Sequence, residues 1–301
     1  MATTREIRDR INSIGDTLKI TNAMYLISST KLRKAKKALL DTEPYFYSIQ
    51  SLMARLIRHL PEGFSHPYLD FRTDIEKSQL RRGYIAVTAD KGLAGAYNHN
   101  VLKLVEEKLA EHSNNMLFVV GEVGRQYFEQ RGIPIDEQFH YTAQNPSLHR
   151  SRMITARMLD LYFRREIDEV YIVYTRMKNS LQMETEIVQL LPLNKLNRET
   201  FDKAVSAGVT QQDFRMEPSP KAVIDNIVPN YLDGFIYGAL VESFCCEQNA
   251  RMMAMDAANK NGQQMKHDLS VEYNRVRQGQ ITQEITEICA GARAQRSGQG
   301  S

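Results

Sequence analysis

A repeating apolar pattern near the N-terminus limits the fold of this chain more than any other feature. Between Met1 and Glu43 there is no proline, and apolar or small residues recur at alternating spacings of four and three. They are Ile7, Ile11, Ile14, Leu18, Thr21, Tyr25, Ser28, Leu32, Ala35 and Leu39. Such a heptad seam predicts a long helix that pairs with another helix in a coiled coil. The small residues Thr21, Ser28 and Ala35 predict that the partner helix approaches closely.

The start of this helix and a break within it are also marked in the sequence. Thr3 and Glu6 match a capping box, in which each side chain accepts a hydrogen bond from the other residue's N–H group. Pro44 is expected to kink or interrupt the helix because proline lacks an N–H group. Helical spacing resumes after it, so we assign residues 1–58 to an N-terminal coiled-coil helix.

A second long helix is predicted at the other end of the chain. The last 72 residues, after Pro229, contain no proline, and Asn230 is a suitable helix cap. We predict a coiled-coil helix over residues 230–290 that runs antiparallel to the first, and we expect Gly262 and Gly279 to let it bend. At about 1.5 Å per residue this helix is roughly 90 Å long, so much of it must project from a domain of ordinary size.

Between the two helices the hydrophobic period changes to that of an α/β domain. Strands are expected at residues 84–89, 116–121, 170–175 and 186–193, and helices at 100–112, 122–131 and 147–165. This alternation predicts a Rossmann-like domain with a mainly parallel sheet. The predicted organisation is an α/β domain at 75–195, a connecting segment at 196–229 and a flexible tail at 291–301.

The segment "IAVTADKGLAGAYNHN" after the first strand resembles the start of a phosphate-binding loop. Its glycines, Gly92 and Gly95, give only G-x-x-G, whereas a dinucleotide fingerprint needs G-x-G-x-x-G. The dipeptide Gly-Lys of a P-loop occurs nowhere in the chain. We therefore predict a tight strand-to-helix turn braced by Asp90, with Lys91 solvated, and keep a ligand site as the alternative.

No motif for catalysis, cofactor binding or metal binding is found. No two of the seven histidines are four residues apart, and neither H-E-x-x-H nor G-x-S-x-G occurs. The histidines are expected to be solvated or packed in the core. The three cysteines, Cys245, Cys246 and Cys289, form no C-x-x-C pair, which favours a reducing cytosol, and the adjacent two are expected to pack as small apolar groups.

Positive charge is concentrated at the N-terminus. The whole chain has a net charge of +3, but residues 1–58 hold eleven Lys or Arg against five Asp or Glu. Five of these cations lie in "KLRKAKK", residues 31–37, which is either a solvated helix face or a contact for nucleic acid or an acidic protein. No stacking aromatics accompany the run, so an acidic protein partner is favoured over nucleic acid. No apolar run is long enough to cross a bilayer and no signal peptide is evident, so membrane contact is expected only through a partner.

Several long motifs resemble the gamma subunit of the bacterial F-type ATP synthase. They are "EIRDRINSI", "KITNAM", "SSTKLRKAKKAL", "TADKGLAGAYN", "EQNARMMAMDAANKNG" and "LSVEYNRVRQGQITQEITEICAGA", in an order that covers the whole chain. The resemblance implies an asymmetric antiparallel coiled coil that enters a ring of alternating alpha and beta subunits, with the α/β domain at its foot.

The resemblance also implies a function without catalysis by this chain. Such a subunit is the central rotor shaft, which couples ion-driven rotation of the c-ring to conformational change and ATP synthesis or hydrolysis at the beta subunits. Its partners are the alpha3beta3 hexamer, the epsilon subunit and the c-ring, with no nucleic acid, no cofactor and no direct membrane insertion. The expected location is the cytoplasmic side of the cell membrane, as a peripheral protein.

Three groups of residues correspond to partner contacts of that family. The shaft face that passes acidic loops of the beta subunits corresponds to Met24, Lys31, Arg33, Lys34 and Lys36. A catch that hydrogen-bonds one beta subunit corresponds to Arg277, Gln278 and Thr282. An apolar tip that turns in a hydrophobic sleeve corresponds to Ile281, Ile285 and Ile288, for which core packing against the N-terminal helix is the alternative.

This chain departs from the family's chloroplast form in one respect. The chloroplast form carries an inserted regulatory cysteine pair, and this chain has no cysteine between Thr175 and Pro229, so redox control of that kind is not expected. Without a transit peptide, a bacterial source is expected. The alternatives are a nucleotide-dependent α/β enzyme with helical arms and a coiled-coil scaffold without rotary function.

Overall fold

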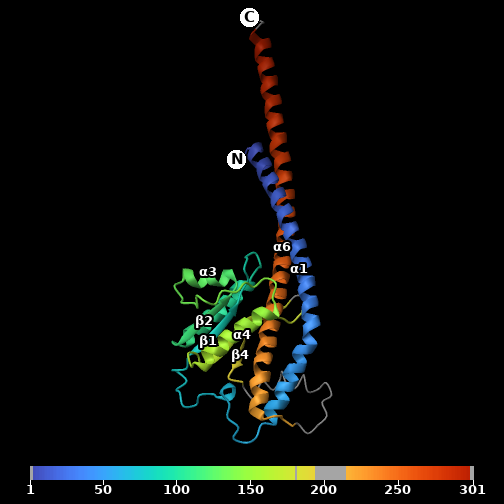
Figure 1. Cartoon of the computed structure of the whole chain (residues 1–301). Coiled ribbons are helices and arrows are strands. Elements are labelled where there is room, and N and C mark those ends of the chain that lie inside the picture. The colour runs from blue at the N-terminus through green and yellow to red at the C-terminus, as the bar shows by residue number, and fades with distance from the viewer. Residues whose placement is uncertain (1–2, 180–181, 194–214, 299–301) are drawn as a thin grey trace. The chain divides into compact units, whose positions relative to one another are not determined.

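The computed structural model of the chain describes residues 3–179, 182–193 and 215–298. Much of the predicted connecting segment, and the last residues of the predicted tail, lie outside the described residues. The described residues form two long helices and an α/β sheet with shorter helices (Figure 1).

The chain divides into two compact units. The helical unit contains the described parts of Met1–Ile27 and Met252–Ser301, and the α/β unit is Ser28–Arg251. The two long helices, α1 (Thr4–Arg58) and α6 (Pro220–Gly298), contribute residues to both units.

In the helical unit α1 and α6 run antiparallel, as predicted. Leu18 lies against Gly262, and the Thr21 hydroxyl donates a hydrogen bond to Oδ1 of Asn259. A later residue of α1 thus contacts an earlier residue of α6, as in an antiparallel pair. The seam residues of α1 in this unit are all buried or half-buried, which confirms the heptad prediction: Ile7, Ile11, Ile14, Leu18, Thr21 and Tyr25.

Two local features stabilise the helical unit. The capping box is formed as predicted, since the Thr3 N–H donates to Oε2 of Glu6 at 2.9 Å and the Glu6 N–H donates to the Thr3 hydroxyl at 3.3 Å. At Gly262 an added Cβ would lie 2.8 Å from Cδ2 of Leu18. Any larger residue would require the Leu18 side chain to shift, so Gly262 lets the two helices approach closely, which is a different role from the predicted bend.

Both long helices contain a proline that the sequence analysis treated as a break. Helix α1 continues through Pro44 without interruption, and α6 begins at Pro220 and includes Pro229, so the predicted start at Asn230 is wrong. A proline inside a helix loses one backbone hydrogen bond. Around Pro229 side chains add hydrogen bonds to the backbone, because the Asn230 amide donates to the carbonyl oxygen of Asn226 at 2.8 Å. Asn230 thus lies in the interior of the helix and is not its cap.

The sheet of the α/β unit has four strands in the order β2-β1-β3-β4. Strand β1 is parallel to both β2 and β3, and β4 is antiparallel to β3, which confirms the predicted mainly parallel sheet. The strands are β1 (Arg82–Val87), β2 (Asn115–Val120), β3 (Glu169–Met177) and β4 (Met183–Leu191), and the shorter helices are α2 (Tyr97–Glu111), α3 (Glu122–Gln130) and α4 (Leu148–Phe163).

Each face of the sheet has its own apolar core, because successive residues of a strand point to opposite faces. Ile85 and Val87 of β1 enter the larger core, which contains residues of α4, of the end of α1 and of the first part of α6. Tyr84 and Ala86 enter the smaller core, which contains residues of α2 and α3. The first part of α6 is therefore a structural component of the α/β unit.

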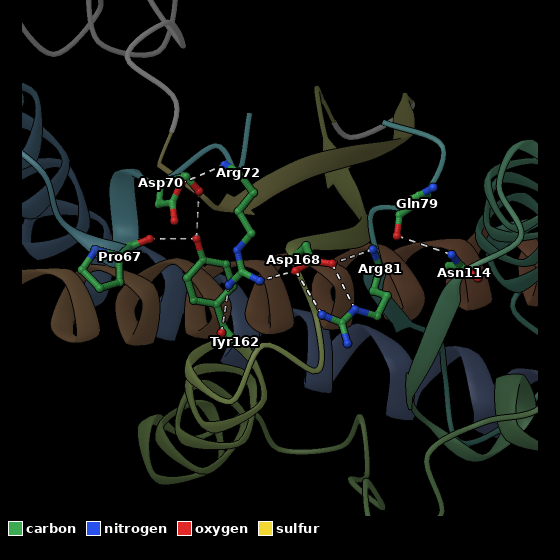
Figure 2. Close-up of polar contacts among 8 residues, drawn as sticks. All are labelled: Pro67, Asp70, Arg72, Gln79, Arg81, Asn114, Tyr162 and Asp168. Carbon is green, nitrogen blue, oxygen red and sulfur yellow. Dashed lines mark hydrogen bonds and ion pairs between the residues drawn. The ribbon is translucent and has the colours of Figure 1, made fainter. Parts of the chain in front are cut away.

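A buried polar network holds the amino-terminal edge of this sheet (Figure 2). Asp168, whose side chain is 1% exposed, accepts hydrogen bonds from the Arg72 guanidinium and from the backbone N–H of Arg81 at 2.9 Å. Arg72 also donates to the carbonyl oxygen of Tyr162 at 3.1 Å, and the Tyr162 hydroxyl donates to the carbonyl oxygen of Pro67 at 2.9 Å. The network anchors the segment between α1 and β1, whose one short helix is η1 (Pro67–Leu69), to the rest of the unit.

Candidate functional site

The carboxyl-terminal edge of the sheet is where an open α/β sheet usually binds a ligand, and here α6 covers it. Neighbouring strands β1 and β3 end at this edge, next to the point where the strand order reverses. The N–H of Thr175 donates to Oγ of Ser243 at 3.2 Å, and the N–H of Met177 donates to Oε1 of Glu242 at 3.2 Å. The backbone groups at the end of β3 are thus bonded to side chains of α6.

The loop after β1 is also bonded to α6, through Arg251. Its guanidinium donates to the carbonyl oxygen of Lys91 at 2.9 Å and to that of Gly92 at 3.1 Å. The same guanidinium pairs with Glu247 at 2.7 Å, and the two side chains are only 8% and 4% exposed. Burial raises the pKa of Glu247, although the charge of Arg251 acts in the opposite direction. The side chain of Lys91 is exposed, as predicted.

Asp90 braces the same loop from its other side, as the sequence analysis predicted. Its Oδ1 accepts the N–H of Glu122 at 3.2 Å and that of Ala143 at 3.1 Å, and its Oδ2 accepts the N–H of Gln144 at 3.2 Å. The hydroxyl of Thr142 also donates to this carboxylate. One carboxylate therefore joins the loop after β1 to the start of α3 and to the segment before α4.

Two glycines allow β1 and the segment after β2 to approach closely at this edge. Gly121 has a φ of 95°, and an added Cβ there would lie 2.4 Å from the carbonyl oxygen of Thr88. At Gly124 an added Cβ would lie 2.6 Å from the Thr88 hydroxyl, to which the Gly124 N–H donates at 3.1 Å. Protein atoms thus surround the end of β1, which favours the predicted turn over a ligand-binding loop.

The basic run of α1 is partly exposed in the α/β unit. Arg33 and Lys34 are exposed, whereas Lys31 and Lys36 are half-buried. They alternate with the buried seam residues Ser28, Leu32 and Ala35. In the helical unit, the predicted contact residue Met24 is half-buried.

In the helical unit, residues 277–291 of α6 are exposed. The contacts of Leu18 with Gly262 and of Thr21 with Asn259 set a register that puts the first residues of α1 opposite Val276. Beyond that point Arg277, Gln278 and Thr282 are exposed, and the tip residues Ile281, Ile285 and Ile288 are 46%, 55% and 71% exposed. Core packing against α1, the alternative for these isoleucines, is therefore wrong.

The three predicted catch residues lie close together on α6. The Thr282 hydroxyl donates to the carbonyl oxygen of Gln278 at 2.9 Å, one helical turn away. Its proton is thus used within the helix, and its free lone pairs can accept a hydrogen bond from a partner. The charged group of Arg277 and the amide of Gln278 are both available at the surface.

The sequence analysis did not identify the residues that bind α6 to the sheet edge. Glu247 and Arg251 are four residues apart in residues 243–255, which are otherwise apolar or neutral, and a charged pair within such a stretch is a signal of a buried ion pair. Arg72 and Asp168, by contrast, are far apart in sequence, and no local pattern connects them.

The described part of the chain contains no candidate metal cluster and no candidate membrane span. There, no group of three or more His, Cys, Asp or Glu side chains is arranged to hold a metal ion. Among the same residues, no helix combines the length and the apolar character that a membrane span requires.

These features define a class of protein that combines a long antiparallel helix pair with a small α/β domain, in which a helix of the chain covers the carboxyl-terminal edge of the sheet. Residues 3–295 match the family model described as ATP synthase. The chain is 43% identical over 291 residues to the ATP synthase gamma chain of Ruminiclostridium cellulolyticum, covering 96% of this chain and 98% of the relative. It is 34% identical to the gamma chain of Acetobacterium woodii that is called sodium ion specific, covering 96% and 98% of the two chains. The chain belongs to the ATP synthase gamma chain family and is a subunit of that enzyme, not a catalyst by itself.

Solved structures support the fold. A chain of the Euglena gracilis mitochondrial ATP synthase, in a structure of its OSCP/F1/c-ring, is similar with a TM-score of 0.64 at 18% identity, covering 99% of this chain and 96% of that one. A chain of the central stalk/c-ring of the Tetrahymena thermophila mitochondrial ATP synthase is similar with a TM-score of 0.59 at 22% identity, covering 79% and 99%. The fold of this chain is thus similar to the folds of these two chains.

Proposed function

We propose that this chain is the central rotor shaft of an F1Fo ATP synthase, which couples ion-driven rotation of a c-ring to ATP synthesis or hydrolysis at the beta subunits. The observation that carries the proposal is the exposed end of α6. Three isoleucines and three polar residues there lie beyond the level at which α1 begins. Exposed large apolar side chains at helical spacing indicate a surface that a partner covers.

Three groups of residues on the two long helices contact partner subunits in this proposal. The apolar tip, Ile281, Ile285 and Ile288, turns in a sleeve at the centre of an alpha3beta3 hexamer. Arg277, Gln278 and Thr282 form a catch that hydrogen-bonds one beta subunit at a time. The face formed by Met24, Lys31, Arg33, Lys34 and Lys36 passes acidic loops of the beta subunits, where exposed ion pairs of about 0–1 kcal/mol each allow movement.

The proposed location follows from the partners. The α/β unit contacts the epsilon subunit and the c-ring, so the chain is peripheral to the cell membrane on its cytoplasmic side. Closure of the ligand-binding sheet edge by Arg251 and Ser243 argues against the alternative of a nucleotide-dependent enzyme.

Co-expression with alpha and beta subunits tests the proposal. We expect a hexamer that retains this chain and that rotates a bead attached to the α/β unit when ATP is supplied. Titration of the isolated chain with Mg-ATP is expected to show no stoichiometric binding. A binding isotherm with one site per chain would support the enzyme alternative, and an ATPase unaffected by the chain would support a non-rotary scaffold.

A further inference from the structure

The contact between α6 and the carboxyl-terminal edge of the sheet combines two kinds of interaction. One is apolar: Ala89, Ala94 and Tyr97 pack against Cys246 and Ala250, and all of these except Tyr97 are small. The other is polar: Ser243 and Glu242 accept hydrogen bonds from the end of β3, and Arg251 donates to the loop after β1. We call Glu242, Ser243, Glu247 and Arg251 the edge clamp.

Within the edge clamp Arg251 has the most demanding geometry. Its guanidinium bonds to the carbonyl oxygens of two successive residues, Lys91 and Gly92, and to the carboxylate of Glu247. The planar group of arginine fixes the directions of several hydrogen bonds together, which a flexible ammonium group does not. Because both charged side chains are buried, water competes little for these bonds.

The loop that Arg251 holds has a conformation that needs support. Leu93 has a φ of 61° and Gly95 a φ of 55°, and the left-handed region is unfavourable for leucine. The Leu93 side chain is exposed, so packing of this side chain does not explain the conformation. The bonds from Arg251 to the two preceding carbonyl groups, together with the Asp90 brace, hold the loop in this form.

We propose that Arg251, positioned by Glu247, fixes the rotational position of the sheet about α6 and carries torque between them. The larger core holds α6 against one face of the sheet, but at the carboxyl-terminal edge the mostly small apolar residues offer few directional restraints. There the bonds of the edge clamp join defined atoms of α6 to the end of β3 and to the loop after β1. This inference rests on the proposed rotary function, in which force enters through the α/β unit and leaves through the long helices.

The main test replaces the buried ion pair by apolar residues of similar size, Arg251→Met with Glu247→Leu, in the complete complex. Such replacements of a buried ion pair usually leave a fold intact, so the complex is expected to assemble. We expect ion-driven ATP synthesis to fall by about threefold or more, while ATP hydrolysis by the detached hexamer, in which the α/β unit bears no load, changes by less than about 1.5-fold. Arg152→Met is the matched control, because Arg152 joins α4 to α6 by pairing with Asp233 at 3.7 Å, but does so from an exposed position.

A second measurement does not depend on rotation. Amide hydrogen exchange in residues 88–97 is expected to become about tenfold faster in the double variant and to stay unchanged in Arg152→Met. Should the double variant not assemble, Arg251→Lys, which keeps the charge beside Glu247 but loses the planar fork, is put through both measurements. Normal synthesis together with normal exchange in the assembled variant would overturn the inference. A wild-type complex that neither rotates nor couples synthesis to an ion gradient would instead overturn the rotary function.

Discussion

Asp168 shows how single buried charges organise the α/β unit. Burial alone would raise the pKa of this carboxyl, but hydrogen bonds from the Arg81 backbone and side chain and the charge of Arg72 outweigh it and lower the pKa below the ordinary value of 3.8. Removing one member of such a pair leaves the other charge buried without a partner. At the opposite edge of the sheet, Glu247 and Arg251 form a comparable buried pair.

The first prediction concerns Asp168→Asn and its dependence on pH. A group whose pKa is lowered by folding stabilises the folded state above its unfolded pKa, and this contribution is lost as the pH falls through the folded pKa. At pH 7 we expect the free energy of unfolding to fall by about 3–5 kcal/mol, because Arg72 stays buried. The difference between wild type and variant should shrink below about pH 4, as measured by urea unfolding at several pH values.

Asp160→Asn is the matched control for this prediction. Asp160 pairs with Arg164 on the surface at 2.9 Å, with both side chains well exposed. Its replacement is expected to cost no more than about 1 kcal/mol. A difference between wild type and Asp168→Asn that stayed constant from neutral to acid pH would contradict the account of the network.

At the scale of the elements, the pairing of α1 with α6 depends on how closely they approach. Two glycines of α6 have different surroundings in the helical unit. Gly262 faces Leu18, whereas an added Cβ at Gly279 would have no atom within 4 Å. Replacing each glycine by alanine therefore distinguishes two effects on stability. At Gly279 only the helix propensity changes, whereas at Gly262 the packing against Leu18 changes as well.

The second prediction compares Gly279→Ala with Gly262→Ala. Alanine in place of an exposed helical glycine stabilises a helix by about 1 kcal/mol, so Gly279→Ala should slow amide exchange in its segment. At Gly262 the added methyl must displace Leu18, and overpacking of about 1–3 kcal/mol should exceed that gain, so exchange over residues 255–270 should become faster. Adding Leu18→Ala to Gly262→Ala should remove most of the overpacking. Equal effects of the two single substitutions would show that the helices are not in close contact.

The elements could be predicted from the sequence to different degrees. The seam from Ile7 to Leu39 predicted α1 because its period is repeated many times, and each apolar strand ends within a few residues of its predicted position. The start of α6 could not be predicted in this way. Proline is normally a helix breaker, yet α6 continues through Pro229. The Arg72 contact with Asp168 depends on tertiary structure alone.

At the scale of the whole molecule, the exposed end of α6 is where, in the proposed function, a beta subunit would contact the shaft at one rotational angle. The third prediction is that Arg277→Leu with Gln278→Leu leaves the complex assembled but lowers both ATP hydrolysis and synthesis by about tenfold or more. A hydrogen bond to a charged group contributes about 1.5–3 kcal/mol, and a contact made at one rotational position favours one beta state by that amount. Steady-state ATPase and ion-driven synthesis measure the effect.

Gln283→Leu is the control for the catch. Gln283 is exposed on the same helix and donates to Glu287 within it, and it faces a different direction from Arg277, Gln278 and Thr282. It is expected to behave like the wild type. An assembled Arg277→Leu with Gln278→Leu variant that turned over at the normal rate, with normal ion pumping, would show that these residues make no catch.

The burial of two of the three cysteines makes this chain suited to site-specific labelling. Cys245 and Cys246 are buried, and burial raises the pKa of the Cys245 thiol to about 12 and also raises that of Cys246. Because the thiolate is the form that reacts with maleimides, both are protected at neutral pH. Cys289 is exposed near the end of α6. A fluorescent dye can thus be attached close to the tip of the natural chain before assembly, without removal of any cysteine.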